Sequence, residues 1–249
     1  MVDTPRGPAK VGGVSLALLG ALLLVRVQGV PSGEPERPRP LSAFQVAKAE
    51  ALLRDRLPCL GCHEVGGEGG RIGPGLSELK RSRTQAFVAA MIRDPERVVP
   101  GTIMPRVPMP RGTRELIAAY LVQREPTGAA PVRPSPPAAR RAADTARDGD
   151  TARYARFCAA CHGTGGGGDG YNARFLPVRP TAHADSAYMS ARSDDALFDA
   201  IFAGGYVMNR SNRMPPYGQT LSRDEIRGLV RYMRTLCRCA GPAWSRDNP

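Results

Sequence analysis

The feature that most constrains this chain is a five-residue motif, Cys-x-x-Cys-His, which occurs twice. The two copies read Cys59-Leu60-Gly61-Cys62-His63 and Cys158-Ala159-Ala160-Cys161-His162. A bare Cys-x-x-Cys is compatible with a redox disulfide or half of a zinc site, but the histidine that follows each pair is typical of covalent haem attachment. The thiols bind the porphyrin, and the imidazole binds the iron. The sequence therefore predicts two covalently attached haem c groups, held through Cys59, Cys62, Cys158 and Cys161.

The composition favours two small haem domains over one large fold. Aromatic residues make up 6% of the 249 residues and include a single tryptophan, Trp244, which is little for a large aromatic core. A small helical domain gains the missing apolar mass by wrapping around a macrocycle. Alternating strand patterns are absent, so we expect an all-α fold of two small helical haem domains in tandem.

The chain carries a formal net charge of +12, most of it from arginine. The arginines are scattered through both halves, whereas nucleic-acid binding requires a clustered basic stripe. Haem propionates offset part of the excess. The remaining positive charge predicts redox protein partners with acidic surfaces, and its scattered distribution predicts no binding to nucleic acid.

Residues 1–29 read as an export segment. Arg6 and Lys10 precede an apolar run over Val11–Val25, which is short for a membrane-spanning helix and suits a signal peptide. Because Arg26 lies between this run and the small residue Gly29, an uncleaved membrane anchor is the alternative. Either reading predicts a periplasmic protein, soluble or tethered to the membrane.

The rest of the chain divides at two proline-rich stretches. The predicted parts are a tether (30–41), a first haem domain (42–125), a linker (126–147), a second haem domain (148–240) and a tail (241–249). Each domain has a helix leading into its haem motif, then a glycine-rich stretch, a middle helix, a Met-Pro loop and a final helix. The linker is long enough to hold the domains apart and equally able to lie against them.

Capping patterns place the first and last helices. Ser42 and Gln45 form a capping box before a helix over 43–57, and Ser222 and Glu225 form one for a helix over 221–236. The last helix of the first domain is expected over 113–124. Asp148 and Asp150 are candidate caps for the helix that leads into the second motif.

The two irons need axial ligands, and the chain has three histidines. His63 and His162 are committed by their motifs, so the first domain has no second histidine and its sixth ligand is expected to be methionine. Met104 is the candidate, because its distance from Tyr120 resembles that of Met214 from Tyr232. Met109, in a second Met-Pro pair, is the alternative.

In the second domain Met214 is the matching ligand, since the prolines after it stiffen its loop. Met208 is its rival, and His183 would make a bis-histidine haem. A ligating imidazole donates its other N–H to a carbonyl. Pro74 is expected to supply this carbonyl in the first domain.

In the second domain Pro180 is expected to supply the corresponding carbonyl, with Pro177 as the alternative. The end of the second domain, just before the tail, holds Cys237 and Cys239 without a histidine, so it is not a third haem motif. A local disulfide is expected there in an oxidising compartment. Metal binding or attachment to a partner is the alternative.

The chain resembles class I c-type cytochromes and, as a pair, the diheme cytochromes of the c4 type. The resemblance lies in both haem motifs, in Gly73-Pro74-Gly75-Leu76, in Gly101-Thr102-Ile103-Met104-Pro105, and in Met214-Pro215-Pro216-Tyr217-Gly218. It implies three to four helices around each haem, histidine–methionine ligation and one-electron transfer through an exposed haem edge. The long linker and the tail depart from the family pattern.

Two functions fit these observations. The first is an electron carrier or the cytochrome subunit of a respiratory or other oxidoreductase complex, with no catalytic residues of its own. The second is a diheme enzyme, of the peroxidase or sulfur-compound dehydrogenase type, with one open haem site. The enzyme would need acid–base groups on the distal side of one haem, and His183 with Asp185 are the nearest candidates.

Overall fold

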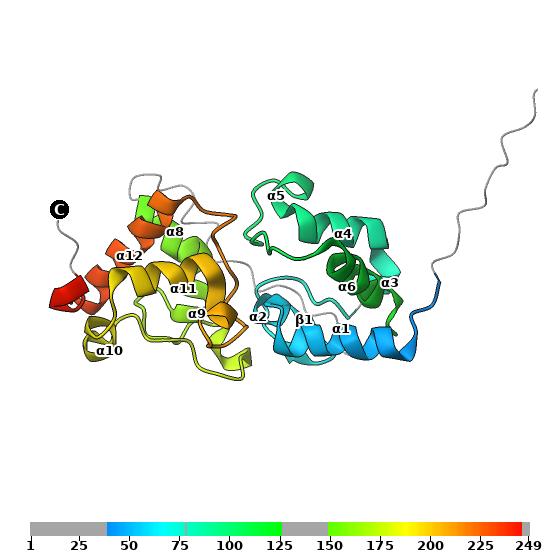
Figure 1. Ribbon diagram of the computed structural model, residues 1–249, viewed down its shortest axis with the longest axis horizontal. Helices are drawn as coiled ribbons and strands as arrows, with labels where there is room; N and C mark the ends of the chain where they lie inside the picture. Colours follow the sequence, from blue (N-terminus) through cyan, green and yellow to red (C-terminus); the bar gives the residue numbers. More distant parts are fainter. Residues whose placement is uncertain (1–38, 78, 126–148, 246–249) are drawn as a thin grey trace, which may run out of the picture. The chain divides into compact units, whose positions relative to one another are not determined.

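The computed structural model describes residues 39–77, 79–125 and 149–245 (Figure 1). The expected signal peptide or anchor (1–29), all but the end of the tether, the linker (126–147) and the last residues of the tail lie outside the described residues. Among the residues that are described, no helix is both long enough and apolar enough to cross a membrane.

The first half is built from six helices and one short hairpin, as far as it is described. The helices are α1 (Ala43–Asp55), α2 (Cys59–Cys62), α3 (Leu79–Ser82), α4 (Gln85–Arg93), α5 (Pro95–Val98) and α6 (Arg111–Gln123). The strands β1 (Glu64–Val65) and β2 (Glu68–Gly69) pair antiparallel.

This hairpin was not predicted, because each strand has only two residues and no alternating pattern. Gly66 and Gly67 connect the strands with positive φ angles of 66° and 92°. Two consecutive positive φ angles suit the tight turn that matches strand twist, and glycine adopts them without steric cost. The hairpin therefore forms because these two glycines allow the turn between its strands.

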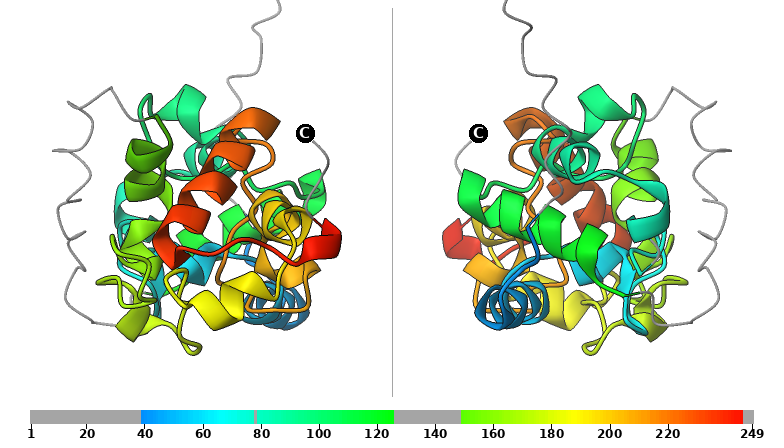
Figure 2. Two further views of the ribbon diagram at one scale, coloured as in Figure 1. Left: turned by 90° about the vertical axis from the view of Figure 1, so that its left-hand side faces the viewer. Right: turned by 90° about the vertical axis from the view of Figure 1, so that its right-hand side faces the viewer.

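The described residues of the second half form helices and 3₁₀ turns joined by loops, and none of them is in a strand. Its elements are α8 (Gly149–Phe157), α9 (Ala159–His162), the 3₁₀ turn η1 (Ala173–Phe175), α10 (Ser186–Ser190), α11 (Asp194–Val207), α12 (Arg223–Cys237) and the 3₁₀ turn η2 (Ala243–Ser245). Both side views show helices joined by loops (Figure 2).

The predicted capping boxes start two helices. Ser42 and Gln45 exchange side-chain and backbone hydrogen bonds ahead of α1, and Ser222 and Glu225 do so ahead of α12. The helices end close to the expected positions. Asp150 is not a cap: it lies inside α8, where its carboxylate pairs with Arg153 at 2.8 Å.

The buried apolar residues form two separate cores. One lies within residues 49–121, where α6 packs against α4 and α1 (Figure 1). The other lies within 154–237, where α12 packs against α8 and α11. The apolar side chains of α12 recur at helical spacing and face this core, namely Ile226, Leu229, Val230, Met233 and Cys237. The fold is all-α, as expected.

Hydrogen bonds also connect the two halves. The Arg106 backbone N–H donates to Thr220 Oγ1 at 2.9 Å, and Asn212 Nδ2 donates to the carbonyl oxygens of Arg54 and Leu57 at 3.0 and 3.1 Å. The first and second halves therefore lie against each other in the described structure.

Candidate haem sites

The first motif places its histidine against a short loop. His63 follows α2, and its Nδ1 lies 2.8 Å from the carbonyl oxygen of Pro74. A Cβ on Gly73 would fall 2.3 Å from the imidazole carbon Cε1, so glycine is required for this loop to pass over the ring. Pro74 is thus placed where the sequence predicted.

The second motif repeats this arrangement with a different partner. His162 Nδ1 lies 2.9 Å from the carbonyl oxygen of Thr181, one residue beyond Pro180, so the prediction of Pro180 was wrong. The carbonyl of Pro180 instead faces Gly168, where a Cβ would approach it to 2.4 Å. Glycine-rich backbone thus fills the space around the Pro180 carbonyl. No sequence signal distinguished Thr181 from its neighbours.

These contacts determine which imidazole nitrogen is available to iron. A carbonyl oxygen only accepts hydrogen bonds, so Nδ1 carries the proton in both His63 and His162, and Nε2 keeps its lone pair. Burial lowers the pKa of both histidines, and the carbonyl contact opposes this in part. Both imidazoles are therefore held neutral, which is the state that binds a metal.

The four motif cysteines are free and partly buried. Burial raises the pKa of Cys59 to about 11 and that of Cys62 and Cys158 to about 12. Reactive thiols in Cys-x-x-Cys redox motifs have lowered pKa values. The raised pKa values argue against a thiol–disulfide exchange centre.

The Met-Pro loop of the first half carries both methionine candidates. Met104 and Met109 are partly buried and pack against the core of that half. The Met104 backbone N–H donates to Thr102 Oγ1 at 3.2 Å, which orders the chain just before Pro105. Met104 as the ligand stays a prediction, with Met109 as its alternative.

The Met214 loop is positioned by two glycines in α11. Gly204 interrupts the helix with φ of 81°, and a Cβ there would meet the Pro216 nitrogen at 2.8 Å. The Gly205 N–H donates to the Met214 carbonyl at 3.0 Å. Met214 packs against the core of the second half, whereas Met208 caps the end of α11.

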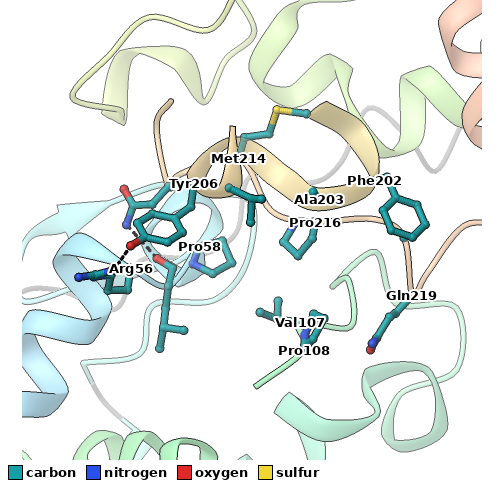
Figure 3. Close-up of a pocket in the computed structure, with 14 residues that line it drawn as sticks. Arg56, Pro58, Val107, Pro108, Phe202, Ala203, Tyr206, Met214, Pro216 and Gln219 are labelled. Carbon is teal, nitrogen blue, oxygen red and sulfur yellow. Dashed lines mark hydrogen bonds between the residues drawn. The ribbon is translucent and has the colours of Figure 1, made fainter. Parts of the chain in front are cut away.

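Met214 also lines an apolar cavity of about 380 Å³. Figure 3 labels Met214 with Ala203, Tyr206 and Pro216, which also line this cavity. Val107 and Pro108 of the first Met-Pro loop form the facing wall. The two Met-Pro loops therefore border the same apolar space.

His183 does not lie where a sixth ligand would have to be. Its ring stacks on that of His162, with centroids 4.0 Å apart and planes 14° apart. Its Nδ1 lies 3.0 Å from the Tyr154 hydroxyl. The two axial ligands of one iron would have to lie on opposite faces of the haem. Because the His183 and His162 rings stack side by side, His183 packs against the motif histidine and is not placed as the second ligand.

The position of His183 in the second half corresponds, counted along the chain, to that of Leu76 in the first half. His183 comes two residues after Thr181, whose carbonyl oxygen accepts from His162, as Leu76 comes two residues after Pro74. The second half therefore has an imidazole where the first has an apolar side chain. Burial and the neighbouring His162 lower the pKa of His183 to about 2, so this ring is neutral.

Cys237, the last residue of α12, forms a disulfide with Cys239, and their Cα atoms are 5.2 Å apart. Within the described part of the chain, no group of three or more histidine, cysteine or acidic side chains could hold a metal ion. The end of the second half thus has the local disulfide that was expected.

The residues at each motif fit a haem c. Two thiols and a neutral imidazole with a free Nε2 are the donors that the motif itself supplies to such a group. In the first half these are Cys59, Cys62 and His63, and in the second half Cys158, Cys161 and His162. Met104 and Met214 stay the predicted sixth ligands.

Residues 144–233 match the family of cytochrome c oxidase, cbb3-type, subunit III, which is less than half of the chain. The match contains the second motif, Thr181 and Met214. It supports a c-type cytochrome with covalently bound haem c and an electron-transport role. The sequence matches none of the curated proteins with which it was compared.

Among solved structures, the chain is similar to one from the reducing HAO-like protein complex of Kuenenia stuttgartiensis. The identity is 20%, with 81% of this chain and 99% of that chain covered, and the TM-score is 0.29. This likeness is too low to support an argument about fold or function.

Proposed function

We propose that the chain is a diheme c-type cytochrome that passes single electrons between redox proteins in the periplasm. It would act as a free carrier or as the cytochrome subunit of an oxidoreductase complex. The N-terminal segment would export it, either as a cleaved signal peptide or as a membrane anchor.

One observation carries this proposal: the two halves repeat the same ligand arrangement. Each has a Cys-x-x-Cys-His motif, an imidazole whose Nδ1 is bound to a loop carbonyl, and a Met-Pro loop against the core. A repeated arrangement of this kind argues for a haem in each half, although the family match covers only the second.

The chemistry follows from the ligands. A bound haem supplies a one-electron couple between Fe(II) and Fe(III), and a thioether ligand raises its potential. The protein holds the imidazole in one tautomer and surrounds it with packed side chains, so little has to move when the charge changes. No proton and no bond is exchanged in the reaction.

The excess of positive charge supports acidic redox partners. Opposite charge would orient a partner as it approaches and would make association faster at low ionic strength.

The enzyme alternative loses its best candidate residue. A diheme enzyme would need acid–base groups opposite the motif histidine of one haem. His183 stacks on His162 and is bound to Tyr154, so it is not available on the opposite face. No other histidine remains in the chain.

A count of covalent haems tests the proposal. The full chain, produced with haem-attachment machinery, is examined by intact mass and by the absorption of its alkaline pyridine complex. We expect two haems per chain. The paired variants Cys59→Ala/Cys62→Ala and Cys158→Ala/Cys161→Ala are each expected to retain one. A wild-type chain with one haem or none would overturn the proposal.

A further inference from the structure

One side chain, that of Asn172, bridges the two haem motifs. Asn172, just before η1, belongs to the second half and has no exposed surface. Its Nδ2 donates to the Gly61 carbonyl oxygen at 2.8 Å and to Cys161 Sγ at 3.3 Å. One amide nitrogen thus contacts the middle of the first motif and a haem-attaching sulfur of the second.

The other end of the same amide completes the bridge. Asn172 Oδ1 accepts a hydrogen bond from the Arg71 backbone N–H at 2.7 Å. The Asn172 backbone N–H donates to the Ala160 carbonyl at 2.9 Å, which ties it to the second motif. Each of these polar groups therefore has a partner, and a buried polar group with its partners satisfied fixes one geometry.

The surrounding backbone is shaped to admit this side chain. A Cβ on Gly70 would lie 2.8 Å from Asn172 Oδ1, and a Cβ on Gly61 would lie 1.9 Å from the Arg213 carbonyl oxygen. Both positions require glycine. The Arg71 guanidinium lies 4.4 Å from the centre of the Phe175 ring, a second contact at the same place. The two halves thus meet closely at their motifs.

We propose that Asn172 is a positioning residue that clamps the two haem attachment sites together and so sets the rate of electron exchange between them. The inference rests on the proposed function, since it requires a haem at each motif. In the exchange, one electron leaves the ferrous iron of one half and reduces the ferric iron of the other, with no bond or proton transferred. The chain then works as one two-centre relay.

The test uses the full diheme chain and three variants. Asn172→Ala removes the bridge, and Asn172→Asp keeps its size and its acceptor for Arg71 but loses the donor to Gly61. Asn212→Ala is the matched control, because it removes two hydrogen bonds between the halves that do not touch a motif. Haem content and the absorption spectrum show which variants have folded with both haems.

Two readouts report on the distance between the haems. One electron is delivered to the oxidised chain by a pulse of flavin radical, and its redistribution between haems is followed by absorbance. Paramagnetic resonance of the fully oxidised chain reports the magnetic interaction of the two ferric irons. We expect both Asn172 variants to lower the rate of electron exchange between the haems at least about tenfold and to weaken the magnetic interaction of the irons. The reason is that reacting groups held in the wrong relative position react more slowly. Asn212→Ala should change neither.

The inference would be overturned if a folded Asn172 variant kept the wild-type rate of electron exchange and the wild-type magnetic interaction. It would also be overturned if Asn212→Ala lowered both as much as the Asn172 variants do, because any contact between the halves would then have the same effect. If Asn172→Ala fails to assemble, Asn172→Asp decides by the same criteria. A wild-type chain that binds fewer than two haems is a different result, because it overturns the proposed function before Asn172 is tested.

Discussion

At the scale of single residues, the sequence predicted the motif cysteines and histidines. It predicted only one of the two carbonyl groups that hold the histidines in place. Pro74 stands in a short Gly-Pro-Gly context that limits where its carbonyl points. In the second half a longer loop leads to Thr181, and only the folded backbone shows which carbonyl reaches His162. The same loop brings His183 onto the motif histidine, although it is a lone histidine in the sequence.

The axial methionine of the first half is open to a direct comparison of two variants. Met104→Ala should remove the thioether from the iron and abolish the sulfur-to-iron charge-transfer absorption of that haem in the oxidised chain. Met109→Ala, its matched control in the neighbouring Met-Pro pair, should keep that absorption. The reverse pattern would assign the ligand to Met109.

His183 is expected to matter for stability more than for ligation. His183→Leu copies the side chain found at Leu76 and leaves the Tyr154 hydroxyl without its partner, although that residue is 1% exposed. An unpaired buried hydroxyl costs about 1–3 kcal/mol, which denaturant unfolding would measure. Adding Tyr154→Phe should recover part of that loss.

The haem spectrum supplies the second readout for His183→Leu. Since the ring lies beside His162 and not opposite it, the low-spin spectrum of the second haem should be retained. A change to a high-spin spectrum in this variant would mean that His183 is a ligand after all.

At the scale of elements, patterns with a local cause were predictable. Capping boxes fixed the starts of α1 and α12, because Ser, Gln and Glu side chains satisfy the first N–H groups of their own helices. The hairpin β1–β2 and the interruption of α11 at Gly204 depend on positive φ angles at glycines. A glycine in the sequence permits such an angle without requiring it.

The interruption of α11 gives a test of how the Met214 loop is held. Gly204→Ala imposes a side chain at φ of 81° and against Pro216, so we expect a loss of at least about 1–2 kcal/mol in unfolding free energy. Gly165→Ala is the control, since a Cβ there meets nothing within 4 Å. Equal stability of the two variants would contradict this role of Gly204.

The capping box of α12 predicts a contribution that depends on pH. The Ser222 backbone N–H holds the pKa of Glu225 below its ordinary value of 4.5. A carboxylate with a lowered pKa in the folded state stabilises the protein above the unfolded pKa, and this stability is lost as the pH falls through the folded pKa.

Glu225→Gln keeps an acceptor for Ser222 without the charge. Stability measured by denaturant from pH 6 down to pH 3 should therefore fall less steeply in Glu225→Gln than in the wild type. Identical slopes would mean that the charge of Glu225 contributes nothing to the cap.

At the scale of the whole molecule, the sequence predicted two similar halves but not how they meet. The linker composition allowed both separation and contact. Contacts such as Asn172 to Gly61 and Arg106 to Thr220 join residues distant in the sequence, and neither motif nor periodicity encodes them. The hydrogen bonds place the two motifs together, which turns two predicted haem domains into one candidate relay.

The central claim is that both irons have their two axial positions filled by side chains, so that the chain transfers electrons and leaves no iron open to a small molecule. Titration of the fully reduced, diheme chain with carbon monoxide, followed by haem absorption, tests this claim most directly. We predict that neither haem binds the gas. Stoichiometric binding at one haem would show an open or replaceable site in that half and would contradict the claim.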